Sequence, residues 1–219
     1  AFRRSFYLRC PGERYACVGD ASLGRGPLIV LVAAFSMPAL GVRLSVSVDH
    51  ASVWQPPLHE LSLQLDLLRE KARQRVPAEG LGCLVIGAHN ALSGHAQPAL
   101  EALERWLVGN ALAAEAQQLI GLGPGLTPSG DDYLGGMLVS LRLTGRAMQA
   151  GGLWRWLQPR LKERTSAISA RPLAAATAGE AHEALHDFLN GSLDFDKLSA
   201  VGHTSGWDAL AGAVAVLKA

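Results

Sequence analysis

The chain has 219 residues, enough to bury a hydrophobic core without disulfide bonds or a structural metal. Hydrophobic residues make up 49% and charged residues 18%, a composition that excludes wholesale disorder and predicts a globular protein. Lys and Arg number 20 against 19 Asp and Glu, and a net charge of +1 gives no broad electrostatic field for nucleic acid, so we expect no nucleic-acid partner.

The first part of the chain carries the residue types of strands and turns. β-Branched and aromatic residues form short runs between Phe6 and Val48, and Pro and Gly interrupt them. Residues 28–32 are predicted to be a strand buried on both faces. A half-buried strand is predicted where apolar residues alternate, at Val42, Leu44, Val46 and Val48. We therefore expect a small sheet or barrel in a β-rich part, residues 1–55.

Neither export nor membrane insertion is predicted. The longest apolar run, from Pro27 to Phe35, is shorter than the roughly 20 residues that a membrane span needs. The first residues lack the apolar core of a signal peptide. Three cysteines without a C-x-x-C pair argue against a disulfide framework and a zinc ribbon. These features predict a cytoplasmic protein that does not contact membranes.

Residues 56–219 are predicted to form a mainly helical part. Leu58, Leu61, Leu65 and Leu68 recur at helical spacing, whereas residues 81–87 are predicted to be one further buried strand. Ala- and Leu-rich segments then predict helices over residues 98–108, 110–120, 130–145, 153–169, 172–190, 194–201 and 206–218. The predicted fold class is therefore α+β, with the sheet first and the helices after it.

The strongest candidate for a ligand site is the glycine-rich segment from Gly121 to Asp132. Gly121 is predicted to end the preceding helix in the left-handed conformation, and Ser129 with Asp132 matches a capping box that starts the next helix. Such a start offers unpaired N–H groups and the positive end of a helix dipole, which suit a phosphate or a carboxylate. The residues predicted to bind this anion are Gly123, Gly125, Leu126, Thr127, Ser129 and Gly130.

Two carboxylates at this helix start are candidates for catalysis. Asp131 and Asp132 are predicted to transfer a proton, hold a cation or orient a hydrogen-bond donor. A plain capped helix start is the alternative, although it needs far fewer Gly, Pro, hydroxyl and carboxylate residues than these twelve positions contain. The spacing matches neither a dinucleotide fingerprint nor a Walker loop, so nucleotide binding is not indicated.

A shorter segment, residues 202–208, repeats this chemistry. Residues 129–136 and 205–212 share serine, two glycines, aspartate and leucine at matching positions. His203 adds an imidazole that can move a proton near neutral pH and is a third catalytic candidate. The segment is predicted to bind ligand through Thr204, Ser205, Gly206 and Asp208, and Asp132 and Asp208 are expected to approach a common cleft. An ordinary capped last helix is the alternative.

His182-Glu183-Ala184-Leu185-His186 satisfies the H-E-x-x-H pattern of zinc hydrolases. Leu189 stands where the extended metzincin pattern has glycine, and only His203 or a late aspartate remains as a third ligand. An amphipathic helix with Leu185 and Phe188 inward explains the same residues. A zinc hydrolase is therefore kept as an alternative, and no metal ligands are assigned.

The two glycine-rich motifs together resemble a known family. Gly-Pro-Gly-Leu-Thr-Pro-Ser-Gly-Asp-Asp-Tyr-Leu-Gly-Gly at 123–136 and Gly-His-Thr-Ser-Gly-Trp-Asp at 202–208 are similar to the H-type family of oxamate carbamoyltransferase subunits from bacterial allantoin catabolism. The likeness extends to residues 24–27, Gly-Arg-Gly-Pro, and to Trp54-x-Pro56. This resemblance implies a subunit of a multi-protein enzyme of purine degradation.

The implied reaction converts oxalurate and phosphate into oxamate and carbamoyl phosphate. The resemblance thus implies a small anionic substrate and other subunits as partners. It implies no cofactor other than a divalent cation that would accompany phosphate. A non-catalytic ligand-binding or scaffolding subunit is the alternative function.

Overall fold

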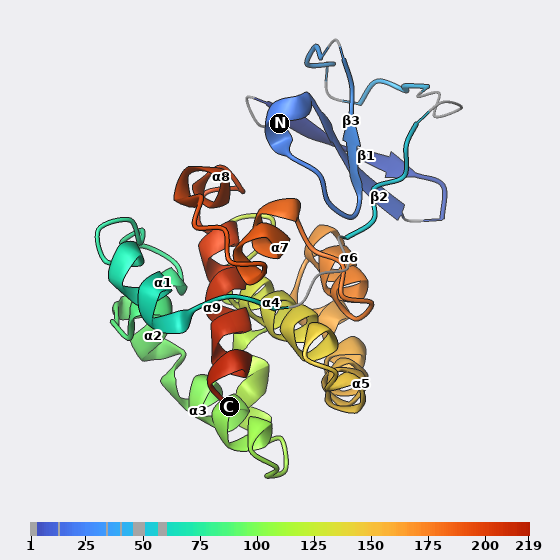
Figure 1. The fold of residues 1–219 in the computed structure, drawn as a ribbon. Coiled ribbons are helices and arrows are strands. Elements are labelled where there is room, and N and C mark those ends of the chain that lie inside the picture. The colour runs from blue at the N-terminus through green and yellow to red at the C-terminus, as the bar shows by residue number, and fades with distance from the viewer. Residues whose placement is uncertain (1–3, 13, 34, 40, 46–50, 57–60) are drawn as a thin grey trace.

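The computed structural model describes residues 4–12, 14–33, 35–39, 41–45, 51–56 and 61–219. Its N-terminal part is a three-stranded sheet of order β1-β2-β3. β1 (Ser5–Cys10) and β2 (Arg14–Gly19) pair antiparallel, and β3 (Ile29–Leu31) pairs with β2 in parallel. The short 3-10 helix η1 (Ala21–Leu23) stands between β2 and β3. Helices follow the sheet along the chain, which confirms the α+β class (Figure 1).

Of the two strands predicted in this part, one is confirmed in place but not in burial, and the other is not found in its described residues. Residues 28–32 do not form a strand buried on both faces, because β3 lies at the edge of a small sheet and Leu28 and Leu31 are 40% and 38% exposed. Leu28 also has a φ of 65°, outside the extended region. Residues 41–45 are irregular, with Val42 and Leu44 exposed; the rest of that predicted strand, Val46 and Val48, lies outside the described residues.

Helices make up most of the remaining chain, and no helix of the described part is both long and apolar enough to cross a membrane. Those predicted at 98–108, 130–145 and 206–218 are confirmed to within two residues at each end, whereas the predicted helix at 110–120 is mainly the 3-10 helix η3. The bounds are α1 (Leu65–Ala72), η2 (Gly82–Ile86), α2 (Ala91–His95), α3 (Gln97–Leu107), η3 (Ala114–Leu119), α4 (Ser129–Leu143), α5 (Ala147–Arg164), α6 (Ala167–Ala176), α7 (Glu183–Leu189), α8 (Phe195–Ser199) and α9 (Ser205–Lys218).

The buried strand predicted at residues 81–87 is wrong, because this segment contains η2. A short apolar run does not distinguish a buried strand from a buried helical turn. Here the Asp208 carboxylate accepts hydrogen bonds from the N–H groups of Leu81 and Gly82, at 2.5 and 3.1 Å. A β-carbon on Gly82 would lie 2.7 Å from the Trp207 Cβ atom. The segment is thus fixed by α9 and not by a neighbouring strand.

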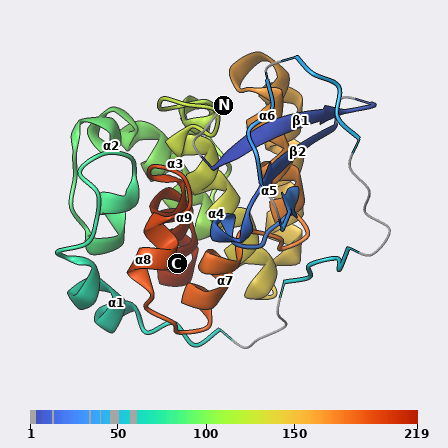
Figure 2. The same cartoon turned by 90° about the horizontal axis from the view of Figure 1, so that it is seen from above.

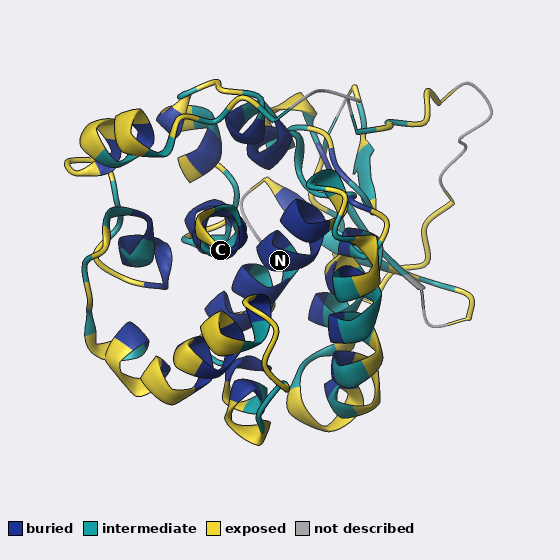
Figure 3. Cartoon of the chain, turned by 60° about the horizontal axis from the view of Figure 1, so that its bottom comes forward, coloured by how far each residue is buried: buried dark blue, intermediate teal, exposed yellow. Residues whose placement is uncertain are grey.

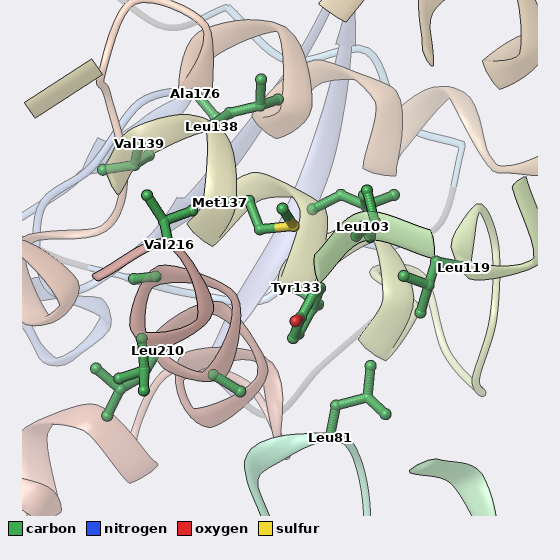
Figure 4. Packing of buried hydrophobic residues seen from close by; sticks show 14 of the residues in the cluster. Leu81, Leu103, Leu119, Tyr133, Met137, Leu138, Val139, Ala176, Leu210 and Val216 are labelled. Carbon is green, nitrogen blue, oxygen red and sulfur yellow. The ribbon is translucent and has the colours of Figure 1, made fainter. Parts of the chain in front are cut away.

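α4 and α9 form the centre of the helical part and pack on each other more extensively than any other helix pair among the described elements. Their buried side chains, among them Tyr133, Met137, Leu138, Leu210 and Val216, belong to one hydrophobic cluster (Figure 4). The burial map shows the same organisation, with buried surface at the centre and exposed surface on the outer helices (Figure 3). The two helices that carry the glycine-rich motifs are therefore the core of the fold.

Candidate functional site

A cavity of about 790 Å³ lies between the sheet and the helical part. One wall is the sheet face that carries Ser5, Tyr7, Tyr15 and Cys17, which share a face because Tyr7 pairs with Cys17 in the hairpin register. The other walls come from α4, α6 and residues 124–129 and 201–206. Seen from above, the sheet lies beside α4 and α6 (Figure 2). Both glycine-rich loops therefore line the same cavity.

The two loops meet because the starts of α4 and α9 are related by an approximate two-fold arrangement. A β-carbon on Gly136 would lie 1.8 Å from the Ala209 carbonyl oxygen, and one on Gly212 would lie 1.9 Å from the Tyr133 carbonyl oxygen. Gly136 and Gly212 occupy matching positions of the two motifs, as do Tyr133 and Ala209. The internal repeat seen in the sequence is thus a structural one, and it allows the two backbones to approach closely.

Each helix start also places a serine hydroxyl near the aspartate carboxyl of the other helix. The Ser205 hydroxyl lies near the Asp132 carboxyl, and the Ser129 hydroxyl lies near the Asp208 carboxyl. The capping box predicted for Ser129 and Asp132 is therefore wrong, since α4 has Pro128 at its N-cap and no side-chain cap. The Thr127 and Ser205 hydroxyl oxygens are 3.1 Å apart and connect the two loops directly.

Only part of the predicted run of N–H groups remains available for a ligand. The Gly130 N–H donates to the Leu122 carbonyl at 2.9 Å, and the Gly206 N–H donates to the Val201 carbonyl at 3.1 Å. By contrast, no acceptor among the described residues takes the N–H groups of Gly125, Leu126, Thr127 and Ser129. The first three belong to the loop that lines the cavity, where positive φ values of 110° at Gly123 and 94° at Gly125 shape the turn.

Asp131 is tied into the protein by three hydrogen bonds. It is 2% exposed and accepts from the Gly121 N–H at 2.9 Å, from the Ser169 hydroxyl at 2.6 Å and from the Thr165 hydroxyl. Burial raises the pKa of Asp131, and these donors offset part of that shift. The carboxylate holds the glycine-rich loop, the end of α5 and the start of α6 together, although it also borders the cavity.

Asp208, which matches Asp132 in the repeat, is fully buried and is not among the described residues that line the cavity. Besides the N–H groups of Leu81 and Gly82, it accepts from the Thr204 hydroxyl at 2.7 Å. Burial raises the pKa of Asp208 despite these donors. The structure thus places Asp208 behind the cavity wall, where it joins α9 to η2, while Asp132 faces the cavity.

Asp132 carries the least satisfied carboxyl group of the site. Part of the residue faces the cavity, yet its Oδ2 atom is shielded from solvent and has no hydrogen-bond partner among the described residues. Burial, opposed by the Ser205 hydroxyl and reinforced by the charges of Asp208 and Asp131, holds the pKa of Asp132 well above its usual range. A raised pKa favours the protonated form of the carboxyl group, and in that form Asp132 can donate a proton or a hydrogen bond.

The raised pKa of Asp132 predicts a dependence of stability on pH. An acid whose pKa is higher in the folded state destabilises the fold by an amount that is negligible below the unfolded value of 3.8, grows as the pH rises above it and becomes constant above the folded pKa. Asp132→Asn removes this penalty, so we expect the variant to be more stable than the wild type at pH 7, with the difference shrinking towards pH 4. Urea unfolding across this range measures it.

Glu163→Gln on the exposed side of α5 is the control and should leave the stability unchanged at every pH. An Asp132→Asn protein less stable than the wild type at pH 7 would show that the carboxylate is instead well accommodated in the fold.

The remaining residues of the second loop either lie at the cavity rim or form hydrogen bonds that stabilise the start of α9. His203 Nε2 lies 2.9 Å from Glu79 Oε2, and both side chains are largely exposed. Thr204 is the N-cap residue of α9, and its hydroxyl is directed to Asp208. Ser205 is therefore the hydroxyl of this loop that lies between Thr127 and the Asp132 carboxyl.

The sheet forms a wall of the site that was not predicted from the sequence. Burial, with the nearby Cys17 and Asp132, raises the pKa of Tyr7 to about 12, and burial raises the pKa of the Cys17 thiol. Both side chains line the cavity opposite α4. The alternation of residues 5, 7, 15 and 17 would have placed them on one face, but nothing in the sequence indicates which element that face covers.

The H-E-x-x-H pattern attaches the sheet to the helical part. His182 is the N-cap residue of α7: its Nδ1 accepts from the Ala184 N–H at 3.1 Å, so its Nε2, 2.7 Å from the Leu23 carbonyl, is the donor. The His186 Nε2 accepts from the Ala181 N–H at 3.3 Å. The described residues contain no group of three His, Cys, Asp or Glu side chains that could hold a metal ion. Helix capping and docking of the sheet account for the motif.

The charges around the cavity are acidic or neutral. Glu79, Glu180, Asp131 and Asp132 line it, whereas no Lys or Arg is found among its described lining residues. The Arg25 side chain near the cavity is paired with Glu183 at 3.3 Å. An anion in this cavity would thus depend on helix dipoles, N–H groups and hydroxyls of the chain itself.

Fold and site together define an α+β protein in which two glycine-rich helix starts meet a small sheet around a large cavity. Residues 119–217 match the model of the family described as oxamate carbamoyltransferase subunit AllH. The match covers less than half of the chain, contains both loops and supports the family predicted from the two motifs. The family is that of a subunit associated with oxamate carbamoyltransferase, a name that describes part of a multi-subunit enzyme. No solved structure matches the chain.

Proposed function

We propose that this chain provides the substrate site of a carbamoyltransferase that converts oxalurate and phosphate into oxamate and carbamoyl phosphate. The observation that carries the proposal is the shared cavity of the two motifs, in which the Asp132 Oδ2 atom has no hydrogen-bond partner among the described residues. The Ser205 hydroxyl lies near this carboxyl group and 3.1 Å from the Thr127 hydroxyl. The family match over both motifs supports the choice of reaction.

In the proposed reaction a phosphate oxygen bonds to the ureido carbonyl carbon of oxalurate, and the bond from that carbon to the oxamate nitrogen breaks. Asp132 gives its proton to the departing nitrogen and receives the proton of the attacking hydrogen phosphate, so the carboxyl is restored. The free N–H groups of Gly125, Leu126 and Thr127 hold an anionic group. Because both reactants are held in one cavity, their reaction no longer depends on a chance encounter in solution, which lowers the entropic part of the barrier.

Positive charge is the component that the walls of the described cavity lack. In this proposal it comes from the helix starts together with a divalent cation that arrives with phosphate or a basic side chain of another subunit. The carbamoyl transfer step therefore takes place in the assembled enzyme. A non-catalytic ligand-binding or scaffolding subunit, the alternative, would bind oxamate without needing Asp132 for turnover.

Binding measurements test the site directly. Calorimetry with phosphate and with oxamate, each with and without Mg²⁺, is expected to show affinity lowered about tenfold or more in Ser205→Ala and Asp132→Ala, because each variant removes a hydrogen bond to a charged ligand. Ser192→Ala, an exposed hydroxyl between α7 and α8, is the matched control and should bind as the wild type does. Unchanged affinity in both cavity variants would refute the site.

Measuring turnover in the complex with the partner subunits distinguishes a catalytic subunit from a binding or scaffolding subunit. Carbamoyl phosphate formation from oxalurate should fall by at least 100-fold in Asp132→Asn, in the range that loss of a general acid produces. A complex that retains full activity with this variant would identify the chain as a binding or scaffolding subunit.

A further inference from the structure

The cavity is larger and more apolar than oxalurate and phosphate require. Both are small polar molecules, whereas a cavity of about 790 Å³ is in the range that encloses a drug-sized ligand. Polar groups line the cavity at the two loops, at the start of α4 and on the sheet face, and Glu79 and Glu180 border it as well. The remaining lining of the cavity consists largely of apolar side chains.

Apolar side chains of α6 and of the N-terminal part line the same cavity. Ile168, Pro172 and Ala176 follow one another at four-residue spacing and so share a face of α6. Leu23, Pro27 and Ile29 line the cavity from the N-terminal part. We name this set the apolar compartment; its members are Leu23, Pro27, Ile29, Ile168, Pro172 and Ala176.

Gly135 leaves the passage from Asp132 to the apolar compartment open. It lies three residues after Asp132, on the same face of α4, and it lines the cavity. Outside its own helix and chain neighbours, the heavy atom that a β-carbon here would meet within 4 Å is the Leu173 Cδ2, at 3.8 Å. The next residue, Gly136, is closely packed against α9 instead. A side chain at 135 would thus occupy cavity space and not helix-packing space.

We propose that the apolar compartment binds the apolar substituent of a ligand whose polar head lies at Asp132, Thr127 and Ser205. The substrate class is then an oxamate or ureido acid that carries a short alkyl or aryl group on nitrogen. This inference rests on the proposed function for the identity of the head group. It adds a subsite that the reaction of oxalurate itself does not need.

Calorimetry with oxamate and N-hexyloxamate tests the compartment. Each methylene group that moves from water into an apolar site contributes about fourfold in affinity. We therefore expect N-hexyloxamate to bind the wild-type protein at least 30-fold more tightly than oxamate. Equal affinities for the two ligands would overturn the inference.

Gly135→Leu is the variant that fills the passage. It is expected to remove most of the gain from the hexyl group, at least tenfold, while the affinity for oxamate stays within about threefold. Gly152→Leu in α5 is the matched control, because a β-carbon there meets no heavy atom within 4 Å and the residue does not line the cavity. Circular dichroism confirms that both variants are folded.

The outcomes distinguish this inference from the proposed function. Oxamate binding without a gain from the hexyl group refutes the compartment alone. A gain that survives Gly135→Leu places the hexyl group elsewhere and also refutes it. Binding of N-hexyloxamate that depends on Gly135, with no measurable binding of oxamate, supports the compartment and counts against the proposed head group. Failure of both ligands to bind refutes both proposals.

Discussion

Gly136→Ala is expected to destabilise the protein by about 3 kcal/mol. The added β-carbon would lie 1.8 Å from the Ala209 carbonyl oxygen, so α4 and α9 must move apart at the centre of the core. Urea unfolding should show a lower midpoint with little change in slope. Gly212→Ala is expected to behave in the same way, because its β-carbon would lie 1.9 Å from the Tyr133 carbonyl oxygen.

Gly135→Ala provides the matched control in the adjacent position. The nearest atom outside its helix and chain neighbours is 3.8 Å away, and alanine favours a helix by about 1 kcal/mol over glycine. This variant should therefore be as stable as the wild type or more stable. Similar unfolding midpoints for Gly135→Ala and Gly136→Ala would contradict the close approach of the two helices.

Asp208→Ala is expected to cost about 3 to 5 kcal/mol in unfolding free energy. It leaves the N–H groups of Leu81 and Gly82 without their acceptor in a buried segment and removes the partner of the Thr204 hydroxyl. Hydrogen exchange should report the loss locally, as faster exchange of the Leu81 and Gly82 amides than of amides in α5.

Asp208→Asn separates hydrogen bonding from charge at this position. Its amide oxygen can still accept from Leu81 and Gly82, so the variant should lie between the wild type and Asp208→Ala in stability. If the amides of Leu81 and Gly82 remain protected in Asp208→Ala, then Asp208 does not fix η2.

Three helices could be predicted well because their periodicity is long and their ends are marked. The helices predicted at 153–169 and 172–190 have wrong bounds, because each runs across the boundary between two observed helices, α5 and α6 or α6 and α7. α3, α4 and α9 each combine repeated apolar residues with Gly or Pro near an end, and their predicted bounds are close to the observed ones. The segment at 81–87 could not be predicted, because its backbone conformation depends on Asp208, more than 120 residues away. Local patterns carry no information about such a partner.

The two loops of the site could be predicted from the sequence, but the contacts between the elements that surround them could not. The repeat indicated two similar helix starts, and the structure brings both loops to one cavity. The sequence did not indicate that Asp131 and Asp208 are held in buried hydrogen-bond networks, or that Tyr7 and Cys17 face the cavity from the sheet. Those facts depend on how the two parts of the chain pack.

The length of the two loops explains how matching residues acquire different surroundings. Five residues separate Gly123 from Ser129, but only two separate Gly202 from Ser205. The longer loop covers the cavity with free N–H groups, whereas the shorter one turns directly into α9. The two matching aspartates therefore have different surroundings. The Asp132 carboxyl borders the cavity with its Oδ2 atom unpartnered among the described residues, whereas the Asp208 carboxyl accepts the buried hydrogen bonds that fix η2. Substitution of Asp208 is therefore expected to loosen η2, whereas substitution of Asp132 is expected to change the cavity and the pH dependence of stability together.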